Sequence, residues 1–324
     1  MSPTVAIIGQ GIAGSMLAWA CERGGIDFVI YDAGHADAAS RVGAGLVSPL
    51  TGQRLVPTWR MAEWRERALS IYRGLEVELG IAIVREMRLR RIFRDSRQRE
   101  RFTRRLGRPE VAPWIEAVDG DGLWLRGALQ VETGTLIATL RRRWLAQGRL
   151  HEHRIDVSEQ VEAERVIWCA GATESAVWNH VPWERSRGEI LGGRMRGLAS
   201  DVVLNDGKWL LPWGDDRVRV GATFDRGDLT AAFRADGRRV LMDAAERLGT
   251  GWLEEPTSMV GFRTTVPDRR PVVGWRQGDQ RTGILGGLAA KGALWAPVLA
   301  AQWVDDGLRG ERIDGEARAD RFSL

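Results

Sequence analysis

The sequence predicts an α/β protein built on a Rossmann-like, parallel nucleotide-binding sheet. Three observations near the N-terminus support this prediction: a short apolar run, a glycine-rich turn that opens a helical pattern, and a second apolar run that ends in an acid. Together they form the strand–turn–helix–strand unit that begins dinucleotide-binding folds.

The first strand is expected at residues 5–8 (VAII), a β-branched apolar run typical of a buried parallel strand. The turn at residues 9–14 (GQGIAG) has the GxGxxG spacing. In this pattern Gly9 permits the tight turn, Gly11 lets the backbone approach a pyrophosphate, and Gly14 lets helix and strand pack closely. The pyrophosphate is expected at the positive N-terminal end of the helix.

The second strand is expected at residues 28–31 (FVIY) and ends at Asp32. A carboxylate about 20 residues after the glycine turn accepts hydrogen bonds from ribose hydroxyls. It would repel a 2′-phosphate, so the pattern favours FAD or NAD over NADP.

Composition narrows the class of protein. The chain has 324 residues, enough for about two domains, and 44% hydrophobic and 28% charged residues, which excludes disorder and collagen-like repeats. The two cysteines, Cys21 and Cys169, lie in apolar runs and are expected to be small buried hydrophobes. We expect no metal site, no membrane span and no signal peptide, and therefore a cytoplasmic protein.

The basic residues are almost all arginines. Lysine and arginine total 47, and only two are lysines, which leaves 45 arginines against 43 acids; 15 tryptophans accompany two tyrosines. Such an arginine excess raises the possibility of a nucleic-acid partner. Arginines mixed with acids instead favour a solvated surface, so a nucleic-acid partner is disfavoured.

Several further segments resemble the FAD-dependent D-amino-acid oxidase superfamily. Residues 40–49 (SRVGAGLVSP) are similar to its A-A-G-x-x-x-P loop, and residues 166–172 (VIWCAGA) to its returning strand. Residues 261–274 (GFRTTVPDRRPVVG) and 286–297 (GGLAAKGALWAP) resemble its G-x-R…D-x-x-P-V-I-G element and its last turn and helix. The hairpin expected at residues 209–225 is similar to that of glycine oxidase and of the oxidase domain of a tRNA-uridine modification enzyme.

The resemblance implies a discontinuous FAD-binding domain at residues 1–50, 135–180 and 262–324. An α+β substrate domain with a mainly antiparallel sheet is then inserted at 51–134 and 181–261. The spacing of Trp64, Ala68, Ile71, Leu75 and Leu79 predicts a helix from Pro57 to about Leu79.

FAD is expected to be non-covalent, because relatives with a covalent flavin carry a cysteine in the final turn. The residues expected to bind it are Gly9, Gly11, Ile12, Ala13, Gly14, Asp32, Ala33, Ser40, Arg41, Gly43, Ala44, Gly45, Leu46, Ala170, Gly171, Gly287, Leu288, Ala289, Ala290, Lys291 and Gly292.

The resemblance further implies an FAD-dependent oxidase or dehydrogenase that oxidises a C–N bond of an amino acid or related amine. A hydride would pass to flavin N5 and leave an imine, with O₂ or another acceptor reoxidising the flavin. Arg263 would hold a substrate carboxylate with its two-pronged guanidinium. Lys291 would place a cation beside the flavin, and Arg54 and Trp59 are further candidates for substrate contact.

Two other functional hypotheses stay open at this point: a flavoenzyme acting on modified tRNA, and a flavoprotein with chemistry other than amine oxidation. The tyrosines that often hold the substrate in amino-acid oxidases are scarce here. Tyr31 belongs to the second strand and Tyr72 to the expected helix. We therefore expect substrate contacts that differ from those of such oxidases.

Overall fold

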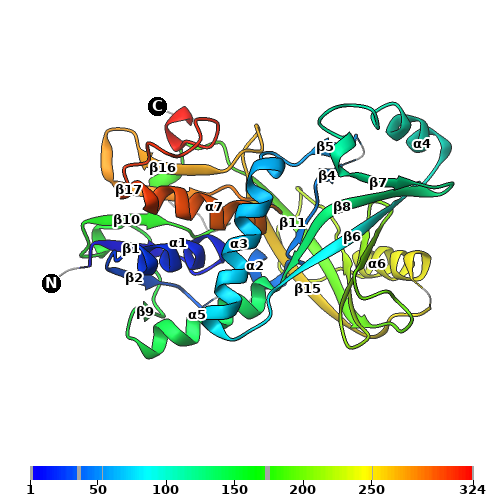
Figure 1. Cartoon of the computed structure of the whole chain (residues 1–324). Helices are drawn as coiled ribbons and strands as arrows, with labels where there is room; N and C mark the ends of the chain where they lie inside the picture. Colours follow the sequence, from blue (N-terminus) through cyan, green and yellow to red (C-terminus); the bar gives the residue numbers. More distant parts are fainter. Residues whose placement is uncertain (1–2, 35–37, 53, 172–175, 250, 323–324) are drawn as a thin grey trace.

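The computed structural model describes residues 3–34, 38–52, 54–171, 176–249 and 251–322. Two β-sheets organise the chain, and Figure 1 shows them side by side with helices packed over the first. This mixed α/β architecture confirms the predicted fold class.

The first sheet has six strands in the order β16-β17-β10-β1-β2-β9. All neighbours are parallel except β16 and β17. Its strands are β1 (Val5–Ile8), β2 (Phe28–Tyr31), β9 (Leu150–His151), β10 (Arg165–Trp168), β16 (Val272–Arg276) and β17 (Asp279–Gly286). The two strands expected at the N-terminus are thus present, with Val5 opposite Phe28.

Alternate residues of β1 enter two different cores. Val5 and Ile7 pack with the helices α1 (Ile12–Arg23), α5 (Thr133–Ala146) and α7 (Gly292–Asp305). Ala6 and Ile8 face the opposite side of the sheet, where they pack with Trp168 and Trp178. The sheet is therefore covered on both faces, as a parallel sheet requires.

The second sheet has nine strands, in the order β15-β11-β14-β13-β12-β6-β8-β3, with β7 on β8. Every pair is antiparallel except β12 and β6. Its strands are β3 (Leu46–Val47), β6 (Val84–Ile92), β7 (Ile115–Val118), β8 (Gly122–Val131), β11 (Glu184–Arg194), β12 (Val202–Asn205), β13 (Trp209–Gly214), β14 (Arg217–Gly221) and β15 (Glu254–Thr265). The expected hairpin is β13 and β14.

The remaining elements are short apart from two helices. The α-helices are α2 (Ala39–Val42), α3 (Met61–Leu79), α4 (Ser96–Thr103) and α6 (Ala235–Leu248), and β4 (Leu50–Thr51) pairs with β5 (Val56–Pro57). Short 3-10 turns lie at Ala112–Trp114, Ser158–Gln160, Ala176–Trp178 and Ala319–Phe322.

The helix α3 differs from its prediction at one end. It begins at Met61 rather than Pro57, because Pro57 belongs to β5 and Arg60 has a left-handed backbone with φ 56°. Its buried residues Trp64, Ala68, Tyr72 and Leu75 join the core that also contains α7. Ile71 and Leu79 are only half-buried at its edge.

Among the described residues, no helix is both long and apolar enough to cross a membrane. The domain boundaries predicted from the sequence stay a prediction. All six strands of the first sheet lie within residues 1–50, 135–180 and 262–324, whereas β3 from the first range pairs in the second sheet.

Candidate active site

A cavity of about 740 Å³ lies where the two sheets meet. On one side it is lined by residues that follow the carboxyl ends of β1, β10 and β17. On the other side are residues of β11, β13 and β15. Ligands of doubly wound sheets bind outside the carboxyl ends of the strands, so this is the expected place for a nucleotide cofactor.

The glycine turn between β1 and α1 forms one end of the cavity. A Cβ on Gly14 would overlap the carbonyl oxygen of Gly9, so only glycine lets the helix come this close to the turn. Gly9 has φ +99°, a backbone conformation that favours glycine. Gly11, Ile12 and Ala13 line the cavity at the N-terminus of α1.

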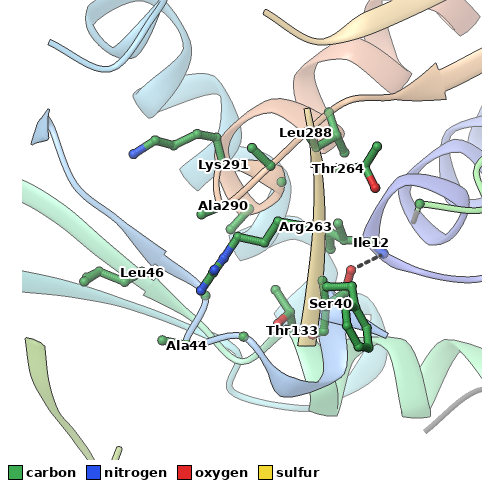
Figure 2. Close-up of a pocket in the computed structure, with 18 of the residues that line it drawn as sticks. Ile12, Ser40, Ala44, Leu46, Thr133, Arg263, Thr264, Leu288, Ala290 and Lys291 are labelled. Carbon is green, nitrogen blue, oxygen red and sulfur yellow. Dashed lines mark hydrogen bonds between the residues drawn. The ribbon is translucent and has the colours of Figure 1, made fainter. Parts of the chain in front are cut away.

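The loop after β2 runs along the same end of the cavity. The hydroxyl of Ser40 accepts a hydrogen bond from the Ile12 amide at 3.0 Å (Figure 2). The Ser40 carbonyl accepts one from Thr133 Oγ1 at 2.6 Å. Gly43, Ala44, Gly45 and Leu46 line the wall as well. A Cβ on Gly45 would overlap the Val131 carbonyl oxygen.

Asp32 is buried at the end of β2, but its carboxylate already has donors. It accepts hydrogen bonds from the Gln10 amide at 2.7 Å, the Gly34 amide at 2.9 Å and Arg141 Nη1 at 3.0 Å. Asp32, Ala33 and the exposed Arg41 do not line the cavity. Sequence reasoning missed Arg141, because α5 is distant in the chain.

The turn before α7 lines another part of the cavity. The segment from Gly287 to Gly292 lines it, together with Ala170 and Gly171 after β10. The Ala289 amide donates to the Thr264 carbonyl at 3.0 Å, which ties the turn to β15. The hydroxyl of Tyr72 donates to the Ala293 carbonyl at 2.7 Å and so holds the first turn of α7.

Arg263 and Lys291 both reach the cavity wall (Figure 2). In that view the two side chains extend to the same side of β15, where Leu46 also lies. Among the described residues neither cation has a hydrogen-bond or ion-pair partner. Burial lowers the pKa of Arg263, and it lowers the pKa of Lys291 to about 8.

Gly188 on β11 makes room for Arg263. A Cβ at this position would overlap both terminal nitrogens of the guanidinium, so the group lies flat against bare backbone. An unpaired guanidinium that is partly removed from water is costly unless a ligand supplies the counter-charge. The arrangement is therefore suited to binding an anionic group.

Two predicted substrate contacts lie elsewhere. Arg54 is exposed and does not line the cavity. Trp59 packs edge-on against Trp64 and Trp295, and its indole nitrogen donates to Glu316 at 2.7 Å. Both follow the cavity loop closely in sequence, and Thr51 and Gly52 of the β4–β5 hairpin still line the cavity.

Other residues that line the cavity were not predicted from the sequence. They are polar and aromatic side chains brought in by the second sheet and by α4, among them Arg91, Arg94, Gln98, Arg185, Asn205 and Trp209. The sequence pattern could have indicated Arg91 as a functional residue, because it follows Met87 and Leu89 on the inward face of β6, where a charge is unexpected.

The residues present fit an FAD molecule. The cavity begins at a helix N-terminus suited to a pyrophosphate and continues along glycine- and alanine-rich backbone to the start of α7. A helix N-terminus stabilises negative charge on a reduced flavin. Fold and site together define a nucleotide-binding protein of the Rossmann type.

The comparisons identify the family. Residues 4–306 match the family described as DAO, FAD dependent oxidoreductase, and the chain belongs to it. The chain is therefore an FAD-dependent oxidoreductase, an enzyme with FAD as its cofactor.

Relatives and solved structures agree with this assignment. The chain is 30% identical, over 91% of its length and 50% of the relative's, to the tRNA 5-methylaminomethyl-2-thiouridine biosynthesis bifunctional protein MnmC of Maricaulis maris. It thus spans about half the length of the curated relatives it matches.

Two solved structures share the fold over nearly the whole chain. Glycine oxidase from Geobacillus kaustophilus has a TM-score of 0.79 at 20% identity and covers 100% of this chain and 98% of its own. Iminodiacetate oxidase from Chelativorans sp. BNC1 has a TM-score of 0.75 at 22% identity, with 98% of each chain covered.

Proposed function

We propose that the enzyme oxidises a C–N bond in an amine or amino acid that carries a carboxylate. The observation behind this proposal is the half-buried Arg263, which lines the cavity and has no partner among the described residues. A guanidinium fork matches a carboxylate in both geometry and charge. The names of the structural neighbours, a glycine oxidase and an iminodiacetate oxidase, support a substrate of this kind.

In this proposal the protein mainly positions the substrate. Arg263 binds the carboxylate and holds the neighbouring carbon at a fixed place in the cavity. Bound FAD supplies the hydride acceptor. Ser40 and residues 43–46, 170–171 and 287–292 would hold FAD without a covalent bond, since the described part of the last turn contains no cysteine.

An anaerobic reduction screen tests this function. The FAD-loaded enzyme is mixed with amino acids, N-methyl amines and cyclic imino acids, and the flavin absorbance is followed. We expect at least one carboxylate-bearing amine to bleach the flavin, about 10²-fold faster than the matched amine without a carboxylate. The proposal fails if no amine reduces a flavin that dithionite still reduces.

Action on modified tRNA is the second candidate, and the named relatives favour it. The segment 94–108 contains seven arginines, and Arg94 and Gln98 from it line the cavity. Such a cluster at the edge of a cavity can contact phosphates. Tight tRNA binding that weakens steeply with salt would support this candidate, and no binding at low salt would eliminate it.

A further inference from the structure

The cavity wall is strongly cationic. Its described lining includes four arginines and one lysine, and no aspartate or glutamate. Arg263 accounts for one anionic group of the proposed substrate. Two of the other cations, Arg91 and Arg94, lie at the end of β6 and just after it, away from the glycine-rich segments in the chain.

Arg91 is buried, with only 6% of its surface exposed. One terminal nitrogen donates to the Gly52 carbonyl at 2.8 Å, whereas Nε is buried and has no hydrogen-bond partner. The guanidinium carbon lies 5.5 Å from the ring centre of Phe102. No carboxylate among the described residues forms an ion pair with it, and burial with repulsion from Arg94 lowers its pKa to about 10.

Arg94 is held in place in the same way as Arg263. A Cβ on Gly207 would overlap its guanidinium, and Gly207 has φ +114°, so the group again lies on bare glycine backbone. Its Nε donates to the Asp206 carbonyl, and its amide donates to Gln98 Oε1 at 3.0 Å. Among the described residues its terminal nitrogens have no acceptor, so they are available to a ligand.

Arg263 and the pair Arg91 and Arg94 line the same cavity. Burial lowers the pKa of Lys208, and repulsion from Arg94 and Arg263 lowers it further, so this lysine lies within electrostatic range of each. Lys208 itself donates to the Ala222 carbonyl at 2.8 Å. The neighbouring carboxylate, Asp206, is already paired with Arg247 at 2.5 Å. The wall therefore keeps an excess of positive charge next to Arg263.

We propose that Arg91 and Arg94 bind a second carboxylate of the substrate, so that the cavity takes an amine with two acidic groups. This inference rests on the proposed function, in which Arg263 binds the first carboxylate. Arg263 and the pair Arg91 and Arg94 can together bind the two carboxylates of a dicarboxylate. A monocarboxylate would leave one of these two cationic groups unpaired, so its binding is disfavoured.

Binding of inert acids separates the subsite from catalysis. Calorimetry compares the binding of glutarate and butyrate to the FAD-loaded enzyme. Neither acid has an amine, and butyrate lacks the second carboxylate. We expect glutarate to bind at least ~10-fold tighter, as a charged hydrogen bond allows. Arg94→Gln should abolish most of this preference, and so should Arg91→Gln where the variant folds. Arg239→Gln, an exposed charge on α6, should keep it.

The same variants are then tested in the reductive half-reaction. Iminodiacetate is compared with N-methylglycine, and we expect the diacid to show the lower Kd in the wild type and in Arg239→Gln, but not in the Arg91 and Arg94 variants. Equal binding of glutarate and butyrate by the wild type would overturn the subsite, even if monoacid amines reduce the flavin. A glutarate preference without reduction by any amine would sustain the subsite and remove the proposed function. Tighter binding of 3-phosphonopropionate than of glutarate, lost in Arg94→Gln, would overturn the carboxylate assignment.

Discussion

The guanidinium of Arg263 lies across the bare backbone of Gly188, where any larger residue would place its Cβ on the two terminal nitrogens. The position of the cation is thus set by a residue on the neighbouring strand, since Gly188 belongs to β11 and Arg263 to β15.

Gly188→Ala is expected to push the guanidinium aside. The obstructing atoms are the far end of a flexible side chain, so the fold should survive while kcat/KM for a carboxylate-bearing amine falls about 10-fold or more. Gly74→Ala in α3 is the matched control, because its Cβ would meet nothing within 4 Å. That change should leave the kinetics unaltered and stabilise the helix by about 0.5–1 kcal/mol. Unchanged kinetics in Gly188→Ala would contradict the positioning role.

Arg263→Ala should lower kcat/KM by about 10²-fold, the loss expected for a charged hydrogen bond to the substrate. Arg263→Lys keeps the charge but loses the fork, so its loss should be intermediate. Stopped-flow reduction of the flavin separates substrate Kd from the reduction rate constant. A wild-type value of kcat/KM in Arg263→Ala would remove Arg263 from the site.

Lys291 should make the midpoint potential of bound FAD depend on pH. Its pKa is about 8, so the side chain is positive below that pH and neutral above it. A nearby positive charge stabilises reduced flavin, so Lys291→Met should have a lower potential than the wild type below pH 8. The difference should shrink as the pH rises above 8.

Lys291→Arg is the control for this prediction, because arginine stays charged throughout the range. Its potential should not show the loss of positive charge near pH 8. Potentiometric titration against a reference dye measures all three proteins. Identical potentials for the wild type and Lys291→Met would show that this lysine does not act on the flavin.

Tyr72→Phe should destabilise the protein through the start of α7. The change leaves the buried Ala293 carbonyl without its 2.7 Å hydrogen bond and costs about 1–3 kcal/mol. Thermal unfolding measures the loss. Tyr31→Phe is the matched control: Tyr31 is half-buried and its ring stacks on His151, so its removal should stay within about 0.5 kcal/mol. Equal melting temperatures for the two variants would contradict this account.

Local patterns predicted the elements that local physics determines. The strand at Val5–Ile8, the glycine turn and the strand at Phe28–Tyr31 follow from apolar runs and turn residues, and the structure has them where expected. Cys21 and Cys169 are buried, and burial raises the pKa of both thiols, as expected for small core residues.

Residues that meet across long sequence separations could not be predicted in the same way. Arg94 lies on Gly207 because β6 pairs with β12, a parallel pairing that no local pattern encodes. Arg141 reaches Asp32 from a helix more than a hundred residues away. Trp59 shows the opposite limit: it is close in sequence to the cavity loop but does not line the cavity, so its contact with substrate stays a prediction.

The packing of α3 has a consequence for engineering. This helix belongs to the segment predicted as part of the inserted domain, yet it shares a core with α7, and Tyr72 bonds to the first turn of that helix. A chimera that exchanged residues 51–134 as a block would replace the helix that packs on α7 with one of different side chains and so disturb this shared core. Grafts meant to alter substrate preference should therefore leave α3 with its own C-terminal helix and exchange only the strands that follow it.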